Sequence, residues 1–333
     1  MEYCAQKYEL GAHMRFGTEI ESARWNESES VWQIRSVAGE EIQAEILASG
    51  VGQLNRPKIP EIPGLGSFAG EAFHSARWNT DYDLKGKAVG VIGNAASAIQ
   101  FIPEVAKEVK HLSIFQRSAN WMLPRNNRAF SEREKRRYQR FPWLARTYRS
   151  LLWALQESQF PAFIGNSRLS RRMERFATRK MREQIQDPEL ERALIPNYPI
   201  GARRILIADD YYPALKRANV DLVLDPIERV IPEGIVTQEG RTRCLDAIVL
   251  ATGFETTAVL SPIKIEGREG QSLGEAWKDG AEAYLGISVA GFPNFFVMYG
   301  PNTNLGHNSI TFMIECQTRY ILDCIRQLTE QKL

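Results

Sequence analysis

In the first 65 residues, a stretch with alternating apolar and polar positions is followed by a proline-rich stretch. Residues 14–48 contain three extended stretches joined by polar turns at Asn26–Ser30 and Ala38–Glu40, a pattern that predicts a β-meander. Residues 50–65 are rich in proline, which can continue neither a helix nor a central strand. We therefore expect a connector between two domains after the meander.

A second pattern, of strand, tight turn, helix and strand, spans residues 87–115. Lys87–Ile92 is a short apolar run with β-branched residues, and Ile99–Val109 has the spacing of a helix that buries one face. Leu112–Phe115 supplies another short apolar run. Together with the small residues of the intervening turn, these stretches predict a nucleotide-binding βαβ unit with two parallel strands.

Small residues give the turn of this unit a loose G-x-A-x-x-A pattern. Because no large side chain blocks the helix N-terminus there, a pyrophosphate can approach its backbone N–H groups. The predicted nucleotide contacts in the turn are Gly93, Asn94, Ala95, Ala96, Ser97 and Ala98. An ordinary small-residue turn between a strand and a helix is the alternative interpretation.

The second strand ends on Gln116 and Arg117, which we also expect to contact the nucleotide. A cation at this position suits the 2′-phosphate of NADP, whereas the free ribose hydroxyl of NAD favours a carboxylate. Arg117 therefore predicts NADP(H) as a cofactor. The alternative is a solvated charge at the end of a strand.

Amphipathic helical spacing dominates residues 130–192, which we predict to be a helical insertion. Ser131 and Glu134 have the spacing of a capping box. One apolar stripe is formed by Trp143, Leu144, Tyr148, Leu151, Leu152 and Leu155. We expect the arginine-rich face of these helices to be solvated, and contact with an anionic membrane surface is the alternative.

Towards the C-terminus the sequence predicts two further buried strands, and a loop that could contact a cofactor follows each of them. Cys244–Glu255 predicts a strand that ends at Thr252 and Gly253, where a residue without Cβ lets the backbone approach a cofactor. Phe295–Tyr299 predicts another strand. The loop after it offers three further cofactor contacts, Pro301, Asn304 and His307. The last two are equally candidates for capping the helix predicted over residues 309–327.

Composition narrows the class of protein. The 333 residues are 44% apolar and 25% charged with a net charge of +2, values typical of a globular protein with no nucleic-acid signature. The four cysteines show no disulfide framework, and the four histidines have no ligand neighbours at metal-type spacing. Since the sequence also shows no signal peptide and no membrane-length apolar run, we expect a cytoplasmic protein without a metal site.

Residues 68–80 form, on their chemistry alone, a loop in which His74 satisfies backbone groups. Their sequence resembles the fingerprint of the flavin-containing and Baeyer–Villiger monooxygenases, F-x-G-x-x-x-H-x-x-x-W, with matches at Phe68, Gly70, His74 and Trp78. Asn79 departs from the Pro or Asp that ends the fingerprint. The resemblance continues through the small-residue turn, QRSANWMLPR, YPIGARRILIADDYYPAL, IVLATGFE and FPNFFVMYGPNTNLGHNS.

This resemblance implies an α/β fold of two dinucleotide-binding domains, with a Rossmann-like NADP domain that carries the helical insertion. It assigns residues 81–245 to the NADP domain, and residues 1–80 and 246–333 to an incomplete FAD domain. It also implies an N-terminally truncated member, because the first FAD-binding motif of the family is absent. We therefore expect weak FAD binding unless a partner chain supplies the missing half of the FAD domain.

The resemblance further implies an NADPH- and FAD-dependent monooxygenase. In this family a C4a-peroxyflavin transfers one oxygen atom from O2 to a ketone, or to a sulfur or nitrogen, of a small organic substrate. Arg204 matches the active-site arginine, with Arg203 in the position of the family's lysine, and such a cation would stabilise the peroxide anion. A salt bridge to Asp209 or Asp210 is the alternative role for Arg204.

Two other functions stay open. The chain could be an inactive NADP-binding remnant or one half of a split flavoenzyme, because it lacks the first motif. A relative of the pyridine nucleotide-disulfide reductases is disfavoured, since those enzymes need a closely spaced cysteine pair that this sequence does not contain.

Overall fold

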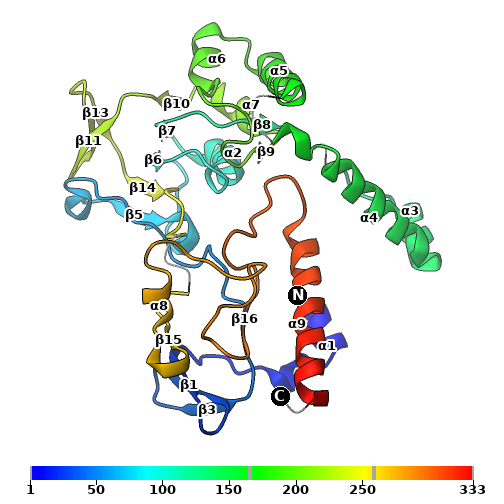
Figure 1. Cartoon of the computed structure of the whole chain (residues 1–333). Helices are drawn as coiled ribbons and strands as arrows, with labels where there is room; N and C mark the ends of the chain where they lie inside the picture. The colour runs from blue at the N-terminus through cyan, green and yellow to red at the C-terminus, as the bar shows by residue number, and fades with distance from the viewer. Residues whose placement is uncertain (1, 126, 164–166, 257–259, 332–333) are drawn as a thin grey trace. The chain divides into compact units, whose positions relative to one another are not determined.

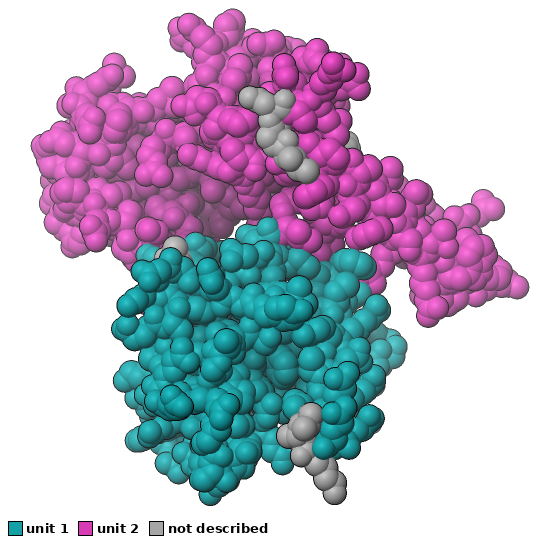
Figure 2. Space-filling model, viewed as in Figure 1, with its two compact units in different colours: residues 1–55, 255–304, 310–333 teal, residues 56–254, 305–309 magenta. Residues whose placement is uncertain are grey.

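The chain folds into two compact units, which are coloured separately in Figure 2. The computed structural model describes residues 2–125, 127–163, 167–256 and 260–331. Unit 1 comprises residues 1–55, 255–304 and 310–333, and unit 2 comprises residues 56–254 and 305–309. The first division falls near residue 55 rather than the expected residue 80, because residues 71–74 form a strand of the unit 2 sheet. Residues 246–254 belong to unit 2 because they contain an inner strand of the same sheet.

A five-stranded parallel sheet organises unit 2 (Figure 1). Its spatial order is β10-β7-β6-β14-β5. The strands are β5 (Glu71–His74), β6 (Ala88–Ile92), β7 (His111–Phe115), β10 (Val220–Val223) and β14 (Ala247–Leu250). β6, helix α2 (Ala98–Glu108) and β7 confirm the predicted strand–turn–helix–strand pattern. β14 is buried along its whole length, as expected for a parallel strand covered on both faces.

Alternate residues of these strands enter two different cores. On one face Val91, Ile114 and Val249 pack with α2 and with helix α7 (Tyr211–Leu215). On the other face Ile92 and Ile248 pack with a three-stranded antiparallel sheet. That sheet is made of β11 (Ile227–Ile231), β12 (Gly234–Thr237) and β13 (Thr242–Cys244).

Between β7 and β10 the chain makes the predicted helical insertion. Its helices are α3 (Glu132–Arg140), α4 (Pro142–Glu157), the 3₁₀ helix η4 (Phe160–Ala162), α5 (Arg168–Ile185) and α6 (Pro188–Leu194), and it is flanked by the paired short strands β8 (Met122–Leu123) and β9 (Leu206–Ile207). The capping box at the start of α3 is confirmed, because Ser131 and Glu134 each accept a backbone hydrogen bond from the other.

Unit 1 contains the predicted meander. β1 (Ile20–Asn26), β2 (Val31–Ser36) and β3 (Glu41–Ala44) pair in antiparallel order, and β15 (Lys264–Glu266) joins β1 in parallel. Trp25, Trp32 and Phe295 form the aromatic centre of the core beneath this sheet. A separate pair joins β4 (Leu47–Ser49) to β16 (Phe295–Val297) in parallel.

Helices complete unit 1 without covering it evenly. α9 (Ile310–Gln331) is long, yet its only buried residues among those described are Gln317 and Ile321. The remaining short helices of the chain are α1 (Glu2–Lys7), α8 (Leu273–Ala276) and the 3₁₀ helices η1 (Leu10–His13), η2 (Leu65–Ser67), η3 (Ser75–Arg77) and η5 (Arg268–Gly270). Within the described ranges, no helix has the length and apolarity needed to cross a lipid bilayer.

Candidate functional site

In the small-residue turn after β6, the backbone of Gly93 lies close to the backbone of Ala251, the residue that follows β14. Gly93 has a φ of +103°, and a Cβ at this residue would lie 2.5 Å from the carbonyl oxygen of Ala251. A side chain would therefore have to push β6 and β14 apart, in a backbone conformation that L-residues rarely adopt. The glycine lets the chain leave the strand sharply at the carboxyl end of the sheet, where ligands bind in folds of this type.

No side chain caps the helix that follows. Ser97 occupies the N-cap position of α2 but makes no capping hydrogen bond from its side chain. Ala95 is exposed, Ala96 and Ser97 are half-buried, and Ala98 is fully buried against the core. The first turn of α2 thus presents backbone N–H groups and small side chains, an arrangement suited to a phosphate group.

Asn94 has a structural role that the sequence did not reveal. Its buried side-chain amide donates to Gln116 Oε1 at 2.6 Å and to the Ser118 carbonyl at 3.1 Å. Gln116 is also buried and donates to the Ala193 carbonyl at 2.8 Å. These contacts tie the turn to the end of β7, so both predicted cofactor residues use their side chains within the protein.

Two arginines lie beyond the end of β7. Arg117 is exposed and forms no ion pair with any of the described residues. Arg203 Nη1 donates to Ser118 Oγ at 2.9 Å, and its guanidinium lies 4.5 Å from the centre of the Tyr198 ring. Burial raises the pKa of Tyr198, and the positive charge of Arg203 partly offsets that shift. The sequence did not single out Ser118 as a partner of Arg203, although it directly follows the predicted Arg117.

Arg204 is exposed and stands apart from both neighbouring carboxylates. Within the described residues it has no ion pair with Asp209 or Asp210. Asp209 instead accepts a hydrogen bond from the backbone N–H of Arg125 at 2.8 Å. The described contacts therefore do not support the salt-bridge alternative, and the catalytic role of Arg204 stays a prediction.

Fingerprint residue His74 lies in the edge strand β5, and Phe68, Gly70 and Trp78 flank that strand. A Cβ on Gly70 would lie 2.4 Å from the Asp246 carbonyl oxygen, so β5 could not pair with β14 in this register. Phe68 packs on the core beneath the three-stranded sheet. Trp78 packs edge-on against Phe101 of α2, with ring centres 5.2 Å apart. Interpreting residues 68–80 as a loop was wrong for Glu71–His74, which pairing with β14 makes a strand.

His74 ends β5 and is only 4% exposed. Its Nδ1 accepts a hydrogen bond from the Ala76 backbone N–H at 3.1 Å, as expected for a histidine that satisfies backbone groups. Its buried Nε2 has no hydrogen-bond partner of good geometry among the described residues. Burial lowers the pKa of His74, and the nearby Gly253 backbone partly offsets that shift.

The predicted strand end at Thr252 and Gly253 lies within unit 2. Thr252 Oγ1 donates to the Lys58 carbonyl at 2.5 Å, and the Lys58 backbone N–H donates to the Gly253 carbonyl at 2.9 Å. Gly253 has a φ of +83° and open space where a Cβ would stand. This glycine therefore serves backbone conformation and leaves one side of the turn accessible.

The three loop residues expected to contact a cofactor differ in their surroundings. Pro301 is buried, and Asn304 is exposed and accepts a hydrogen bond from the Tyr299 hydroxyl at 2.7 Å. The side chain of His307 is 6% exposed, lies 3.4 Å from Glu157, and packs against the rings of Phe160 and Phe163. Neither Asn304 nor His307 makes a capping contact to α9 among the described residues, which does not support the capping alternative.

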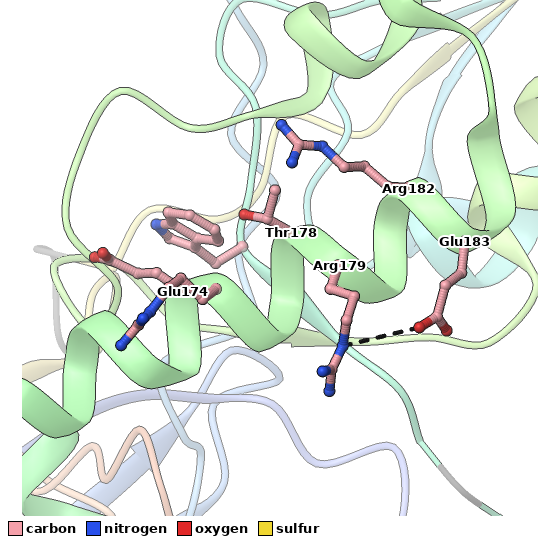
Figure 3. A pocket seen from close by; sticks show the side chains of 7 residues that line it. Glu174, Thr178, Arg179, Arg182 and Glu183 are labelled. Atoms are coloured by element: carbon pink, nitrogen blue, oxygen red, sulfur yellow. Dashed lines mark ion pairs between the residues drawn. The ribbon is translucent and has the colours of Figure 1, made fainter.

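A cavity of about 540 Å³ opens along α5 (Figure 3). It is lined by Trp121, Glu174, Arg175, Thr178, Arg179, Arg182 and Glu183. Two of its arginines are already paired, Arg182 with Glu191 at 3.2 Å and Arg179 with Glu183 at 3.8 Å. One pair lies within α5 and the other joins α5 to α6, so two of the three arginines of the cavity are already paired within the protein. In the described part of the chain, no group of three or more His, Cys, Asp or Glu side chains is placed to hold a metal ion.

Comparison with known proteins places these segments in a family context. A family model described as FMO-like, flavin-binding monooxygenase-like, matches residues 1–256. A Baeyer-Villiger monooxygenase of Pseudomonas aeruginosa is 42% identical over 100% of this chain and 63% of its own length. One from Streptomyces coelicolor is 41% identical over 98% of this chain and 63% of its own length. The chain thus spans less than two thirds of the length of these relatives.

Solved structures show the same likeness in three dimensions. Oxidized steroid monooxygenase bound to NADP matches with a TM-score of 0.88 and 31% identity, over 99% of this chain and 70% of that chain. A structure of OTEMO in complex with FAD and NADP matches with a TM-score of 0.87 and 29% identity, over 99% of this chain and 69% of that chain. The chain that contains this strand–turn–helix therefore resembles one solved chain bound to NADP and another in complex with FAD and NADP.

Proposed function

The chain belongs to the flavin-binding monooxygenase-like family, and from that premise we propose that it takes part in an NADPH- and FAD-dependent monooxygenation. The proposed reaction transfers one oxygen atom from O2 to a ketone, or to a sulfur or nitrogen, of a small organic substrate. When bound, FAD supplies the redox chemistry that accepts a hydride from NADPH and activates O2.

One observation carries the proposal, the turn between β6 and α2. Gly93 has no room for a Cβ, and no side chain caps α2, so a pyrophosphate can rest on the helix N-terminus. The side chains of Asn94 and Gln116 hold that turn to the end of β7. Their proposed role is to position the turn, while the backbone from Gly93 to Ala98 binds the nucleotide.

Arg117 and Arg203 are the proposed ligands of the NADP 2′-phosphate. Arg117 is exposed at the end of β7, and the hydrogen bond to Ser118 together with the Tyr198 ring fixes the direction of Arg203. Arginine suits a phosphate because its planar group offers several parallel N–H donors. We therefore expect NADPH to bind better than NADH.

Five residues are the proposed FAD contacts. Thr252, Gly253 and His307 belong to unit 2, whereas Pro301 and Asn304 belong to unit 1. Gly253 leaves an accessible backbone turn, which fits an approaching cofactor, but the ring of His307 is already packed between two phenylalanines. Of these residues, Gly253 has surroundings that fit a flavin contact best.

Arg204 is the proposed catalytic cation. It is exposed and has no ion pair among the described residues, so its charge is available to a ligand. A fixed cation stabilises negative charge that develops on oxygen during transfer. The reaction would take place in the cytoplasm, a compartment consistent with the free cysteines of the described chain.

Product analysis tests this function. Purified protein is incubated with FAD, NADPH, ¹⁸O2 and a cyclic ketone, and mass spectrometry measures ¹⁸O in the ester product. Because we expect weak FAD binding, FAD is supplied in excess, and we then expect labelled product from the unmodified protein, none from Arg204→Ala, and normal amounts from Arg217→Ala, which removes another exposed arginine of unit 2. Labelled product from Arg204→Ala at the normal rate would reject the role of Arg204.

A second function is an NADP-binding protein without oxygenase activity, or one half of a split flavoenzyme. The observation that favours it is that the proposed NADP residues all lie in unit 2, whereas the proposed FAD residues do not share one unit. NADPH binding measured by calorimetry without any labelled product, even with FAD in excess, would favour this second function.

A further inference from the structure

The apolar face of α4 is exposed along its length. Trp143, Leu151 and Leu155 are 60%, 56% and 53% exposed, and no residue of α4 is buried. Amphipathic helices of globular proteins normally bury such a stripe against a core. Contiguous exposed apolar surface on a helix instead marks a site of contact with another body.

Aromatic packing within the insertion contacts α4 at Tyr148. Tyr148 stacks on Tyr138 of α3 with ring centres 6.3 Å apart, and Phe130 packs edge-on against both rings. The leucines of the second half, Leu151, Leu152 and Leu155, receive no comparable cover from the described residues. The α3–α4 pair extends away from the sheet of unit 2 in Figure 1.

The opposite face of α4 is fixed to unit 2. Glu157, at the last turn, accepts a hydrogen bond from Asn308 Nδ2 at 2.6 Å and lies 3.4 Å from His307 Nε2. At 3.6 residues per turn, Glu157 points away from the side of the helix that carries Leu151 and Leu155. These contacts anchor the helix by its polar side and leave its apolar side outward.

The segment that forms α3 and α4 is also strongly basic. Residues 128–157 contain eight Lys or Arg and three Glu, a net charge of +5 in a chain of net charge +2. Two of the glutamates are already paired, Glu134 with Arg128 and Glu132 with Lys135. Five exposed arginines have no ion pair among the described residues: Arg133, Arg136, Arg137, Arg140 and Arg146.

We propose that the α3–α4 pair docks on the surface of an anionic lipid bilayer, with the apolar face of α4 lying in the plane of the interface. A helix pair with exposed leucines along one face of α4, and with arginines of the same segment that are unpaired among the described residues, is suited to this position, because apolar side chains enter the headgroup boundary while cations neutralise lipid phosphates. A symmetric contact with the same face of a second copy is less favourable, because each copy would bring the same +5 charge to that contact.

Vesicle sedimentation tests the proposal directly. The 333-residue protein is mixed with vesicles of phosphatidylglycerol and phosphatidylcholine in equal parts, and with vesicles of phosphatidylcholine alone. We expect the protein to pellet with the anionic vesicles only, and high salt to release part of it because the arginine contribution is screened. Equal binding to both vesicles, or no binding to either, would overturn the proposal.

Paired variants test whether vesicle binding depends on the apolar face of α4 or on any exposed leucine of the chain. Leu151→Gln with Leu155→Gln should lower the vesicle partition coefficient at least tenfold while the thermal unfolding midpoint stays unchanged, because both side chains are exposed and Gln is a good helix former. Leu322→Gln is the control, since Leu322 is 47% exposed on helix α9 of unit 1, and it should bind as the unmodified protein does. Loss of binding in both proteins would overturn the assignment to α4. So would a concentration-dependent dimer that only the double variant abolishes.

Discussion

Units 1 and 2 bury their secondary structure to very different degrees. The parallel sheet of unit 2 is covered on both faces, and β14 is buried at every residue. In unit 1, β3 alternates between exposed and half-buried residues, and α9 buries two of its described residues. The difference indicates that unit 2 holds its candidate nucleotide site on a rigid, complete core, whereas much of the surface of unit 1 is available for further contacts.

Charge separates the same two units. Unit 1 contains 18 Asp or Glu and 10 Lys or Arg, a net charge of −8. Unit 2 contains 22 Asp or Glu and 32 Lys or Arg, a net charge of +10. An overall charge of +2 therefore hides a strongly basic unit, which is where we propose that NADP phosphates and lipid phosphates bind.

The largest effect should come from a cavity in the core of unit 2. Leu112 of β7 is fully buried, so Leu112→Ala should lower the free energy of unfolding by about 2–5 kcal/mol. Leu322→Ala on α9 removes a leucine that is 47% exposed and should change the free energy of unfolding by less than about 0.5 kcal/mol. Urea unfolding followed by circular dichroism measures both, and equal losses would show that the two units do not differ as described.

A somewhat smaller effect is expected at the turn. Gly93→Ala should cost about 1–3 kcal/mol of stability and also weaken NADPH binding, because its Cβ would meet the Ala251 carbonyl. Gly240→Ala is the matched control, since Gly240 also has a positive φ but has nothing within 4 Å of the place where a Cβ would stand. If both variants lose the same stability and keep the same NADPH affinity, the close approach at Gly93 has no role in the site.

Removing one proposed phosphate ligand should affect binding without affecting stability. Arg117→Ala and Arg203→Ala should each weaken NADPH binding by about 1–3 kcal/mol, the scale of a lost charge-assisted hydrogen bond, and leave NADH binding unchanged. Lys216→Ala removes an exposed cation elsewhere in unit 2 and serves as the control. Calorimetric titration gives each affinity, and parallel losses for NADPH and NADH would place the arginines away from the 2′-phosphate.

The smallest expected effect is a pH dependence of the stability that arises from His74 of unit 2. Burial lowers the pKa of His74 in the folded protein, so below about pH 6.5 the unfolded chain takes up a proton that the folded chain does not. Stability should therefore fall as the pH drops from about 6.5 towards the lowered pKa. Urea midpoints of the unmodified protein and His74→Gln, measured from about pH 7 to about pH 5, should diverge, and identical pH profiles would contradict this role of His74.

Local patterns predicted the elements that form from nearby residues. The turn at Gly93, the meander and the capping box at Ser131 all depend on residues within one short stretch, so their periodicity and turn chemistry are visible in the sequence. The sequence did not reveal that Glu71–His74 is a strand, because that strand exists only through pairing with Ala247–Leu250. Sheet pairing over such separations leaves little trace in local propensity.

In the candidate site, too, local sequence predicted individual residues but not the contacts between residues far apart in the chain. Arg117 was predicted because it ends a strand, but the contact of Arg203 with Ser118 joins residues 85 positions apart. His307 was expected near a cofactor from its loop, and its packing against Phe160 and Phe163 depends on the helical insertion. The stripe on α4 was predicted as a helical face, whereas its exposure follows from the absence of a packing partner among the described residues.

The most direct test of the basic unit as an NADP-binding unit is the ratio of NADPH to NADH affinity of the unmodified protein. The two nucleotides differ only in the 2′-phosphate, so their ratio reports whether unit 2 presents cations to that group. Calorimetric titration at one fixed salt concentration should give an NADPH affinity higher by roughly 5–150-fold, which corresponds to about 1–3 kcal/mol. Equal affinities for NADPH and NADH would contradict the assignment.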